Sequence, residues 1–163
     1  MRKSVGNLEA QMKIYFDVCC LCRPFDDQTS YRIRMETEAV IAILNRCVTD
    51  WDLVSSEVIE HEIQGIAEEE RMQNARSLLQ FAHERVMIDK EIVARARLFH
   101  MSGMDTFDAL HLACAEHSGA VFLTTDDALV KIIKKHADKI TIKVNNPVQW
   151  FMEVIADGSE DAQ

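Results

Sequence analysis

The sequence predicts a single α/β domain built around a mainly parallel sheet. Short segments rich in β-branched and aromatic residues alternate along the chain with longer segments whose apolar residues recur at helical spacing, which is typical of this fold class. The segment 120–124 is apolar up to its last residue, as expected of a strand buried on both faces. The 163 residues suffice for one domain of about 150 residues, and no repeat or linker divides them.

Five short segments are expected to form the strands, because each is apolar and bounded by turn or helix signals. They cover residues 13–16, 51–55, 86–88, 120–124 and 140–144. The first strand leads into Asp17. The last alternates apolar and polar residues, which predicts a strand with one face nearer to water.

Helices are expected over seven segments, several of which begin at a capping residue. They cover 29–46, 57–66, 73–82, 90–99, 107–117, 128–136 and a last helix from Pro147. Ser56 and Asp89 stand where N-caps are expected. Gly119 stands where the helix before the fourth strand should end.

The net charge of the chain is −9, from 18 basic and 27 acidic residues. A net-negative protein gains no long-range attraction to a polyanion, which argues against non-specific coating of nucleic acid. The sequence contains no run of about 18 apolar residues, the length that would predict a membrane span. Residues 1–11 lack the apolar core of a secretory signal. We therefore expect a cytoplasmic domain over 12–156, with an N-terminal extension, 1–11, and an acidic tail, 157–163.

Three of the five cysteines, Cys19, Cys20 and Cys22, lie together after the first predicted strand. An odd number of cysteines in a protein expected in the cytoplasm favours reduced thiols with a packing role. The Cys19-x-x-Cys22 spacing leaves a redox pair as an alternative. A zinc finger would need a second pair at such spacing, and only Cys47 and Cys114 remain.

Four carboxylates stand at positions where chemistry is expected. Asp17 and Asp126 follow two apolar strands, and functional groups gather beyond the carboxyl ends of parallel strands. Glu62 and Asp108 lie inside helices among apolar neighbours. Aspartate is a poor helix former, so Asp108 in particular needs a functional or structural reason.

Each of these acids also has a structural alternative. N-capping would account for both acids at the strand ends, and a solvated helix face would account for Glu62. Asp108 could instead be a helix cap or form a buried pair with Arg95 or Arg97. His111 lies on the same helical face as Asp108, where packing, a bond to the backbone and a place at the rim of a site all remain open.

Convergence of the four acids would require a neutralising partner. At about 4 Å, each like-charge pair costs about 4 kcal/mol at an effective dielectric constant of about 20. Several such pairs rival the total stability of a small domain, about 5–15 kcal/mol. Oxygen-only ligands suit Mg²⁺ or Mn²⁺, and these ions are common cofactors of enzymes that cleave phosphate esters.

Four short blocks follow one another along the chain in a distinctive order. They are Phe16-Asp17, Ser56 with Glu62-Ile63 six residues later, Asp108-Ala-Leu-His-Leu-Ala, and Phe122-Leu-Thr-Thr-Asp126. Together they resemble a PIN domain, most of all the VapC-like toxin ribonucleases, from Lys13 to about Val154. The resemblance implies a five-stranded, mainly parallel sheet sandwiched by helices. It also implies an endoribonuclease that cleaves single-stranded RNA with a water activated by Mg²⁺ or Mn²⁺.

The resemblance assigns roles to individual acids. The catalytic set that it implies is Asp17, Glu62, Asp108 and Asp126. All of these except Glu62 are expected to hold the metal, directly or through water. Glu57 and Glu60 lie on the same predicted helix as Glu62 and are alternative positions for the second acid. Asp105 and Asp127 are candidate outer ligands or alternates.

Other features concern the substrate and the partners. Arg23 closely follows the strand that carries Asp17 and is the candidate RNA contact. The stretch Cys-Leu-Cys-Arg23-Pro-Phe-Asp-Asp27 is unusual beside many such toxins and indicates a PIN-like subgroup. The resemblance further implies a cognate antitoxin as partner and a homodimer. The alternative, from another functional class, is a catalytically inactive PIN-like module that binds RNA or protein.

Overall fold

A computed structural model describes residues 11–161 of the protein. Its five strands form one sheet in the order β3-β2-β1-β4-β5, and every neighbouring pair is parallel. The strands are β1 (Lys13–Phe16), β2 (Asp52–Ser56), β3 (Glu84–Val86), β4 (Val121–Leu123) and β5 (Val144–Asn145). The predicted fold class and the parallel sheet are confirmed.

Helices connect the strands throughout the described range. They are α1 (Val18–Cys22), α2 (Tyr31–Thr49), α3 (Glu57–Gln64), α4 (Glu69–Leu78), α5 (Lys90–Met101), α6 (Thr106–Ser118), α7 (Asp127–Lys135) and α8 (Pro147–Asp161). Short 3₁₀ turns η1 (Arg23–Phe25), η2 (Leu79–Phe81) and η3 (Ala137–Lys139) extend three of these connections. None of the helices in residues 11–161 is both long and apolar enough to cross a membrane.

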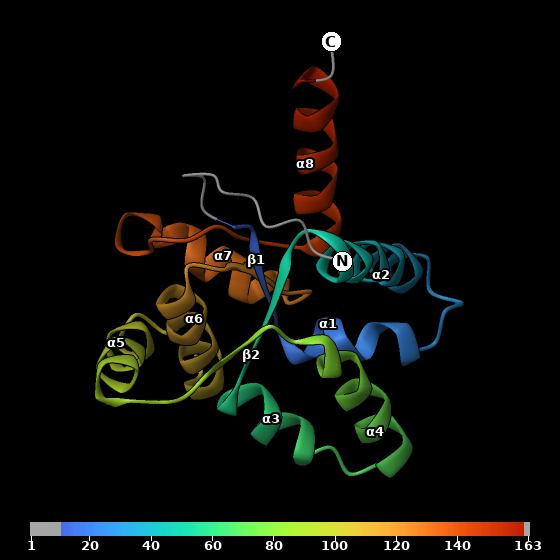
Figure 1. The fold of residues 1–163 in the computed structure, drawn as a ribbon. Coiled ribbons are helices and arrows are strands. Elements are labelled where there is room, and N and C mark those ends of the chain that lie inside the picture. The colour runs from blue at the N-terminus through green and yellow to red at the C-terminus, as the bar shows by residue number, and fades with distance from the viewer. Residues whose placement is uncertain (1–10, 162–163) are drawn as a thin grey trace.

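The order of the strands determines which face each helix covers. The chain moves outward from β1 to β3 and then returns to β4 on the other side of β1, so right-handed crossovers place α2–α4 on one face and α5–α7 on the other. Figure 1 shows α5 and α6 side by side on one side of β1 and β2, with α1, α2 and α4 on the other. All strands therefore end at the same edge of the sheet, between these two layers.

The capping signals in the sequence correctly located several helix ends. The Ser56 hydroxyl accepts a hydrogen bond from the backbone N–H of Ile59, and the Asp89 carboxylate accepts one from the N–H of Ile92. Gly119 ends α6 in the left-handed conformation, with φ of 70°, which glycine adopts at little cost.

Two strands lie at positions different from those predicted, because side chains take their backbone groups. Residues 140–143 were expected in the last strand, but Glu116 accepts hydrogen bonds from the N–H and the hydroxyl of Thr141. The register with β4 covers β5 alone, and Lys143 adds only its carbonyl, which accepts from the N–H of Phe122. Residues 86–88 were expected in the third strand, but the Glu57 carboxylate accepts from the N–H of Ile88. Pairing there covers Glu84–Val86 instead.

Two helices also differ from the prediction. The helix α1 was not predicted, because its five residues include the cysteine cluster and are too few to show a helical period. The helix α4 begins at Glu69 rather than at 73, and its first turn carries Glu69 and Glu70, where the helix dipole favours acids.

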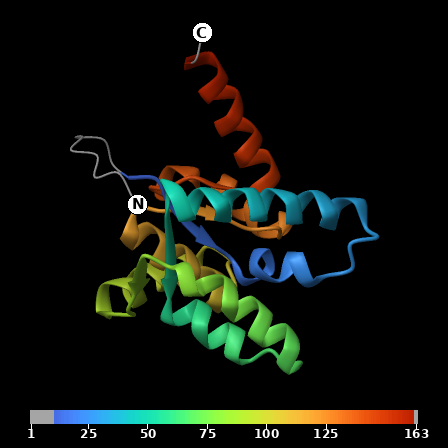
Figure 2. The same cartoon turned by 45° about the vertical axis from the view of Figure 1, so that its right-hand side comes forward.

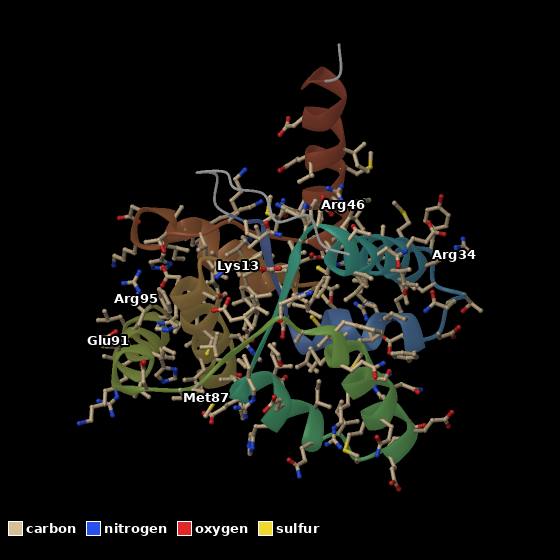
Figure 3. The ribbon with its side chains drawn as sticks, in the orientation of Figure 1. Lys13, Arg34, Arg46, Met87, Glu91 and Arg95 are labelled. Atoms are coloured by element: carbon tan, nitrogen blue, oxygen red, sulfur yellow. The ribbon has the colours of Figure 1, made fainter. Side chains whose placement is uncertain are left out.

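The last helix, α8, projects away from the body in the views of Figures 1 and 2. Its base is fixed by Trp150, whose ring meets that of Trp51 edge-on at 5.4 Å between centroids. Arg46, labelled in Figure 3 where α2 meets α8, places its guanidinium 4.1 Å from the Trp51 ring centroid. Residues 157–161 of the expected acidic tail continue α8, whereas 1–10 of the expected extension and 162–163 lie outside the described residues.

A buried carboxylate, Glu36 of α2, joins three segments near the carboxyl edge of the sheet. Its oxygens accept hydrogen bonds from Arg23 at 2.9 Å, Arg32 at 3.3 Å and the Asn146 amide at 2.6 Å. A buried carboxylate is tolerated when its charge is paired and its lone pairs are used. Glu36 therefore holds η1 and the loop after β5 against α2.

We expect Glu36→Gln to lower the free energy of unfolding by about 1–3 kcal/mol, because at least one buried donor loses its acceptor. Urea denaturation of the purified protein measures the change. Glu38→Gln is the matched control, since Glu38 is exposed on the same helix and its replacement should stay within about 0.5 kcal/mol of wild type. Equal unfolding midpoints for the two variants would contradict a structural role of Glu36.

Candidate active site

Asp17 is the first residue after β1 and is buried. Its backbone N–H donates to the Leu123 carbonyl at 2.9 Å, which continues the pairing of β1 with β4. Its Oδ2 accepts a hydrogen bond from the Thr124 hydroxyl at 2.8 Å. Asp17 occupies the N-cap position of α1, but its side chain makes no capping hydrogen bond. Capping therefore does not explain this carboxylate.

Asp126 follows the neighbouring strand β4 after Thr124 and Thr125, at the same edge of the sheet, and is solvent-exposed. Its Oδ1 accepts from the N–H of Leu129 at 3.1 Å, so this acid does cap α7. Its own N–H donates to the Thr124 hydroxyl at 3.1 Å. Thr124 thus donates to Asp17 while accepting from Asp126, and this one hydroxyl links the two acids that end adjacent strands.

Asp108 reaches the same edge of the sheet from the first turn of α6. Burial is the largest cause that raises the pKa of its carboxyl, from 3.8 to about 6. Negative charges nearby raise this pKa further, and they belong to Asp17, Asp105 and Asp126. Arg95, the alternative partner, pairs with Glu116 at 2.8 Å instead. Asp108 has no ion pair among residues 11–161, and the alternative of a buried arginine pair is wrong.

Glu62 approaches from α3 and is held by a histidine. Its Oε2 lies 2.5 Å from Nε2 of His111, whose side chain is fully buried. Nδ1 of His111 lies 2.7 Å from the Tyr15 hydroxyl. Ligand atoms of Asp17, Glu62 and His111 all lie within 4.8 Å of one another. Glu62 is therefore more than part of a solvated helix face.

The alternative and accessory acids have partners elsewhere. Glu60 pairs with Arg85 at 2.7 Å, and Glu57 accepts from a backbone N–H, as described above. Asp127 pairs with both terminal nitrogens of Arg32, at 2.8 and 2.9 Å, and this hydrogen bonding lowers the pKa of Asp127. Asp105, by contrast, is close enough to Asp108 to affect its pKa. Among the accessory acids, Asp105 is the one that the fold brings towards the four main acids.

Arg23, the candidate RNA contact, is already engaged by two carboxylates. It donates to Glu36 at 2.9 Å and to Asp26 at 2.9 Å, and Asp26 also accepts from Arg71. These bonds balance much of its charge.

The cysteine cluster packs beneath the site. All five cysteines have free thiols, and burial raises the pKa of both Cys20 and Cys22. A redox pair requires a thiol with a lowered pKa, so a packing role fits these residues better. Cys19 is partly exposed, and its Sγ accepts from the N–H of Thr125 at 3.4 Å.

Four polar side chains support the acids: Thr124, Tyr15, Ser56 and His111. Sequence reasoning gave Ser56 only the role of an N-cap, left open a place for His111 at the rim of the site, and assigned no supporting role to Thr124 or Tyr15. His111 does not bond the backbone but contacts two side chains. The available signal was its position three residues after Asp108. The sequence carried no signal for the role of Tyr15, because its partner His111 is 96 residues away.

The donor set of this edge fits a divalent cation. Carboxylate oxygens suit Mg²⁺ or Mn²⁺, and a cation would remove the repulsion that raises the pKa of Asp108. The His111 side chain is fully buried and already uses both of its nitrogens. It therefore fits a supporting role better than that of a ligand. The arrangement can hold a metal, and with it a phosphate group.

Comparison with known families settles the classification. The PIN domain model matches residues 29–135. The chain belongs to the PIN domain family. Glu62, Asp108 and Asp126 lie inside the matched region of this PIN domain, whereas Asp17 precedes it. The resemblance expected from the four sequence blocks is confirmed. No curated protein matches the sequence.

Solved structures share the fold of this PIN domain at low sequence identity. VapBC-1 from nontypeable Haemophilus influenzae has a TM-score of 0.57 and 12% identity, covering 83% of this chain and 98% of its own. FitAcB from Neisseria gonorrhoeae has a TM-score of 0.53 and 15% identity, with 82% and 97% covered. FitAB bound to an IR36 DNA fragment has a TM-score of 0.52 and 17% identity, and the similarity covers 83% of this chain and 95% of its own. These similarities concern the fold.

The raised pKa of Asp108 predicts pH-dependent stability in the absence of divalent metal. The unfolded chain releases this proton near pH 3.8, whereas the folded protein retains it to about 6. The folded state therefore binds more protons in this window, and the free energy of unfolding falls as the pH rises from about 4 to about 6. Asp108→Asn, which is neutral throughout, avoids this loss.

Urea denaturation in EDTA tests the prediction. At about pH 7.5 we expect Asp108→Asn to be more stable than wild type by about 1 kcal/mol, after allowance for solvent screening of a half-buried group. At about pH 4.5 the two proteins should have nearly equal stability. A difference of the same size at both pH values would show that ionisation of Asp108 is not its cause.

Proposed function

We propose that this PIN domain is a divalent-metal-dependent endoribonuclease that cleaves single-stranded RNA. PIN domains are generally nucleases, which supports the reaction class. The observation that carries the proposal is the convergence of acids at the carboxyl edge of the sheet, where Asp17, Asp105 and Asp126 help to raise the pKa of Asp108 to about 6. Mg²⁺ and Mn²⁺ are the metals that these oxygen ligands suit.

Three aspartates would hold the metal in this proposal: Asp17, Asp108 and Asp126. Oδ2 of Asp17 is committed to the Thr124 hydroxyl, which leaves Oδ1 as the ligand atom. Asp126 caps α7 through Oδ1, which leaves Oδ2. A bound metal supplies a Lewis acid for the phosphate and lowers the pKa of a bound water. Glu62, held through Oε2, would complete the ligand shell or orient the attacking water with Oε1.

The charge distribution limits how RNA is bound. The net charge of −9 gives little long-range attraction, so affinity should depend on the metal. Arg23 is our proposed RNA contact from the protein side. Because it already pairs with Glu36 and Asp26, we expect its contribution to phosphate binding to be small beside that of the metal.

We further propose that the protein is the toxin of a toxin–antitoxin pair. The similar structures VapBC-1 and FitAB are toxin–antitoxin PIN proteins. A homodimer also belongs to this proposal and is checked by the molar mass in solution.

The alternative is an inactive module that binds RNA or a partner protein. A labelled single-stranded RNA incubated with increasing Mg²⁺ or Mn²⁺ separates the two functions. Cleavage that depends on metal supports the nuclease, whereas binding without cleavage at every metal concentration supports the module.

Replacing one metal-holding acid should abolish cleavage while the fold persists. We expect Asp17→Asn and Asp108→Asn to lose at least about 100-fold in the rate of metal-dependent RNA cleavage, as for loss of a group that stabilises transition-state charge. Circular dichroism and the unfolding midpoint check the fold. Asp138→Asn is the matched control, because Asp138 is exposed in η3. Wild-type rates for the Asp17 and Asp108 variants would overturn the assignment.

A further inference from the structure

We propose that His111 is a positioning residue that fixes Glu62 through a buried, proton-ordered chain of hydrogen bonds. The inference rests on the proposed function, because it concerns how Glu62 is presented to a metal or to the attacking water. The chain runs from the N–H of Ile59 through Ser56 and Tyr15 to His111 and ends on the Glu62 carboxylate. Its direction follows from counting the protons that each member can give.

The first link is set by the start of α3. The Ser56 hydroxyl accepts from the N–H of Ile59 at 3.1 Å, and a backbone N–H can only donate. The hydroxyl proton of Ser56 then remains for another acceptor. The Tyr15 oxygen lies 2.7 Å away. The thiol of Cys114 is also within reach of Ser56, but sulfur is the weaker acceptor. Ser56 therefore donates to Tyr15.

The second link assigns the tautomer of His111. Tyr15 is fully buried, and burial is the main cause that raises its pKa, so the hydroxyl keeps its single proton. Having accepted from Ser56, it donates to Nδ1 of His111 at 2.7 Å. Nδ1 then carries no proton, and the proton of the neutral ring is on Nε2. This nitrogen lies 2.5 Å from Oε2 of Glu62 and donates to it.

The reverse direction is less favourable. If Tyr15 donated to Ser56, Nδ1 of His111 would carry a proton, and a neutral ring would then place the lone pair of Nε2 against the Glu62 carboxylate. A doubly protonated ring would avoid this repulsion. That ring would carry a positive charge paired with Glu62, would cancel the charge of that carboxylate, and would repel a cation bound nearby.

A neutral donor suits a carboxylate that must also face a cation. Arginine or lysine would orient Glu62 equally well but would add positive charge where a metal is to bind. The Nε2–H of His111 fixes one oxygen of Glu62 and leaves Oε1 available. Partners of metal-binding groups typically contribute about 10–100-fold to metal affinity, and we expect an effect of that size here.

The tautomer is tested first, on the metal-free protein at a pH where free histidine is neutral. Nitrogen-15 NMR of the imidazole rings distinguishes protonated from unprotonated nitrogen, and the signal that disappears in His111→Gln identifies His111. We expect a proton on Nε2 and none on Nδ1. A proton on Nδ1 would overturn the proposed direction of the chain.

The effect on Glu62 is tested by Mn²⁺ binding, measured by calorimetry. His111→Leu removes the donor at similar volume and should weaken Mn²⁺ binding about 10–100-fold. His111→Gln places its amide N–H near the position of Nε2 and should restore most of the affinity. Tyr15→Phe, which frees the tautomer, should fall between the two.

Controls separate positioning from loss of stability. Leu110→Ala perturbs the packing of the same helix, where Leu110 is partly buried, and should lower the unfolding temperature without changing Mn²⁺ affinity. Wild-type affinity in folded His111→Leu would overturn the role of His111. If wild-type protein cleaves no RNA at any metal concentration, the nuclease proposal fails, while the NMR and binding results still decide the role of His111.

Discussion

Repulsion between carboxylates is the constraint on which the rest of this site depends. A parallel sheet brings the ends of all its strands to one edge, and here Asp17 and Asp126 end adjacent strands while Asp108 approaches from the start of α6. A like-charge pair at about 4 Å costs about 4 kcal/mol at an effective dielectric constant of about 20. Burial, followed by repulsion from Asp17, Asp105 and Asp126, raises the pKa of Asp108 to about 6. Relief requires either a proton or a cation.

The partners of these acids indicate which form of relief the site is built for. Within the described residues, a threonine hydroxyl holds Asp17 and a backbone N–H holds Asp126, and both donors are neutral. The imidazole of His111 holds Glu62 and, in our proposal, is neutral as well. The nearby arginines are directed to other acids, such as Glu36, Asp26 and Asp127. Neutral donors fix the direction of a carboxylate without cancelling its charge. That charge remains available for a metal.

The parts of this arrangement that sequence could predict are those encoded locally. Apolar strands ending at Asp17 and Asp126 give the topology and two of the acids, and the N-cap at Ser56 sets the start of the helix that carries Glu62. The parts that sequence missed depend on contacts between distant residues. The last strand begins later than predicted, where the Glu116 carboxylate accepts a hydrogen bond from the N–H of Thr141. The support of Glu62 depends on the hydrogen bond between Tyr15 and His111, which lie 96 residues apart in the sequence. No local pattern encodes such pairs.

The carboxylate cluster also affects the stability of the fold, in opposite directions with and without a bound metal. Unpaired acids destabilise the metal-free fold, whereas a ligand that binds only the folded state stabilises it by RT ln(1 + [L]/Kd). Structural pairs that do not include the four acids, such as buried Glu36 with Arg23 and Arg32, contribute stability in the absence of metal. That network supports η1 and the loop after β5 without contributing charge to the acids. The fold can therefore persist without metal while keeping a carboxylate cluster that is completed by a cation.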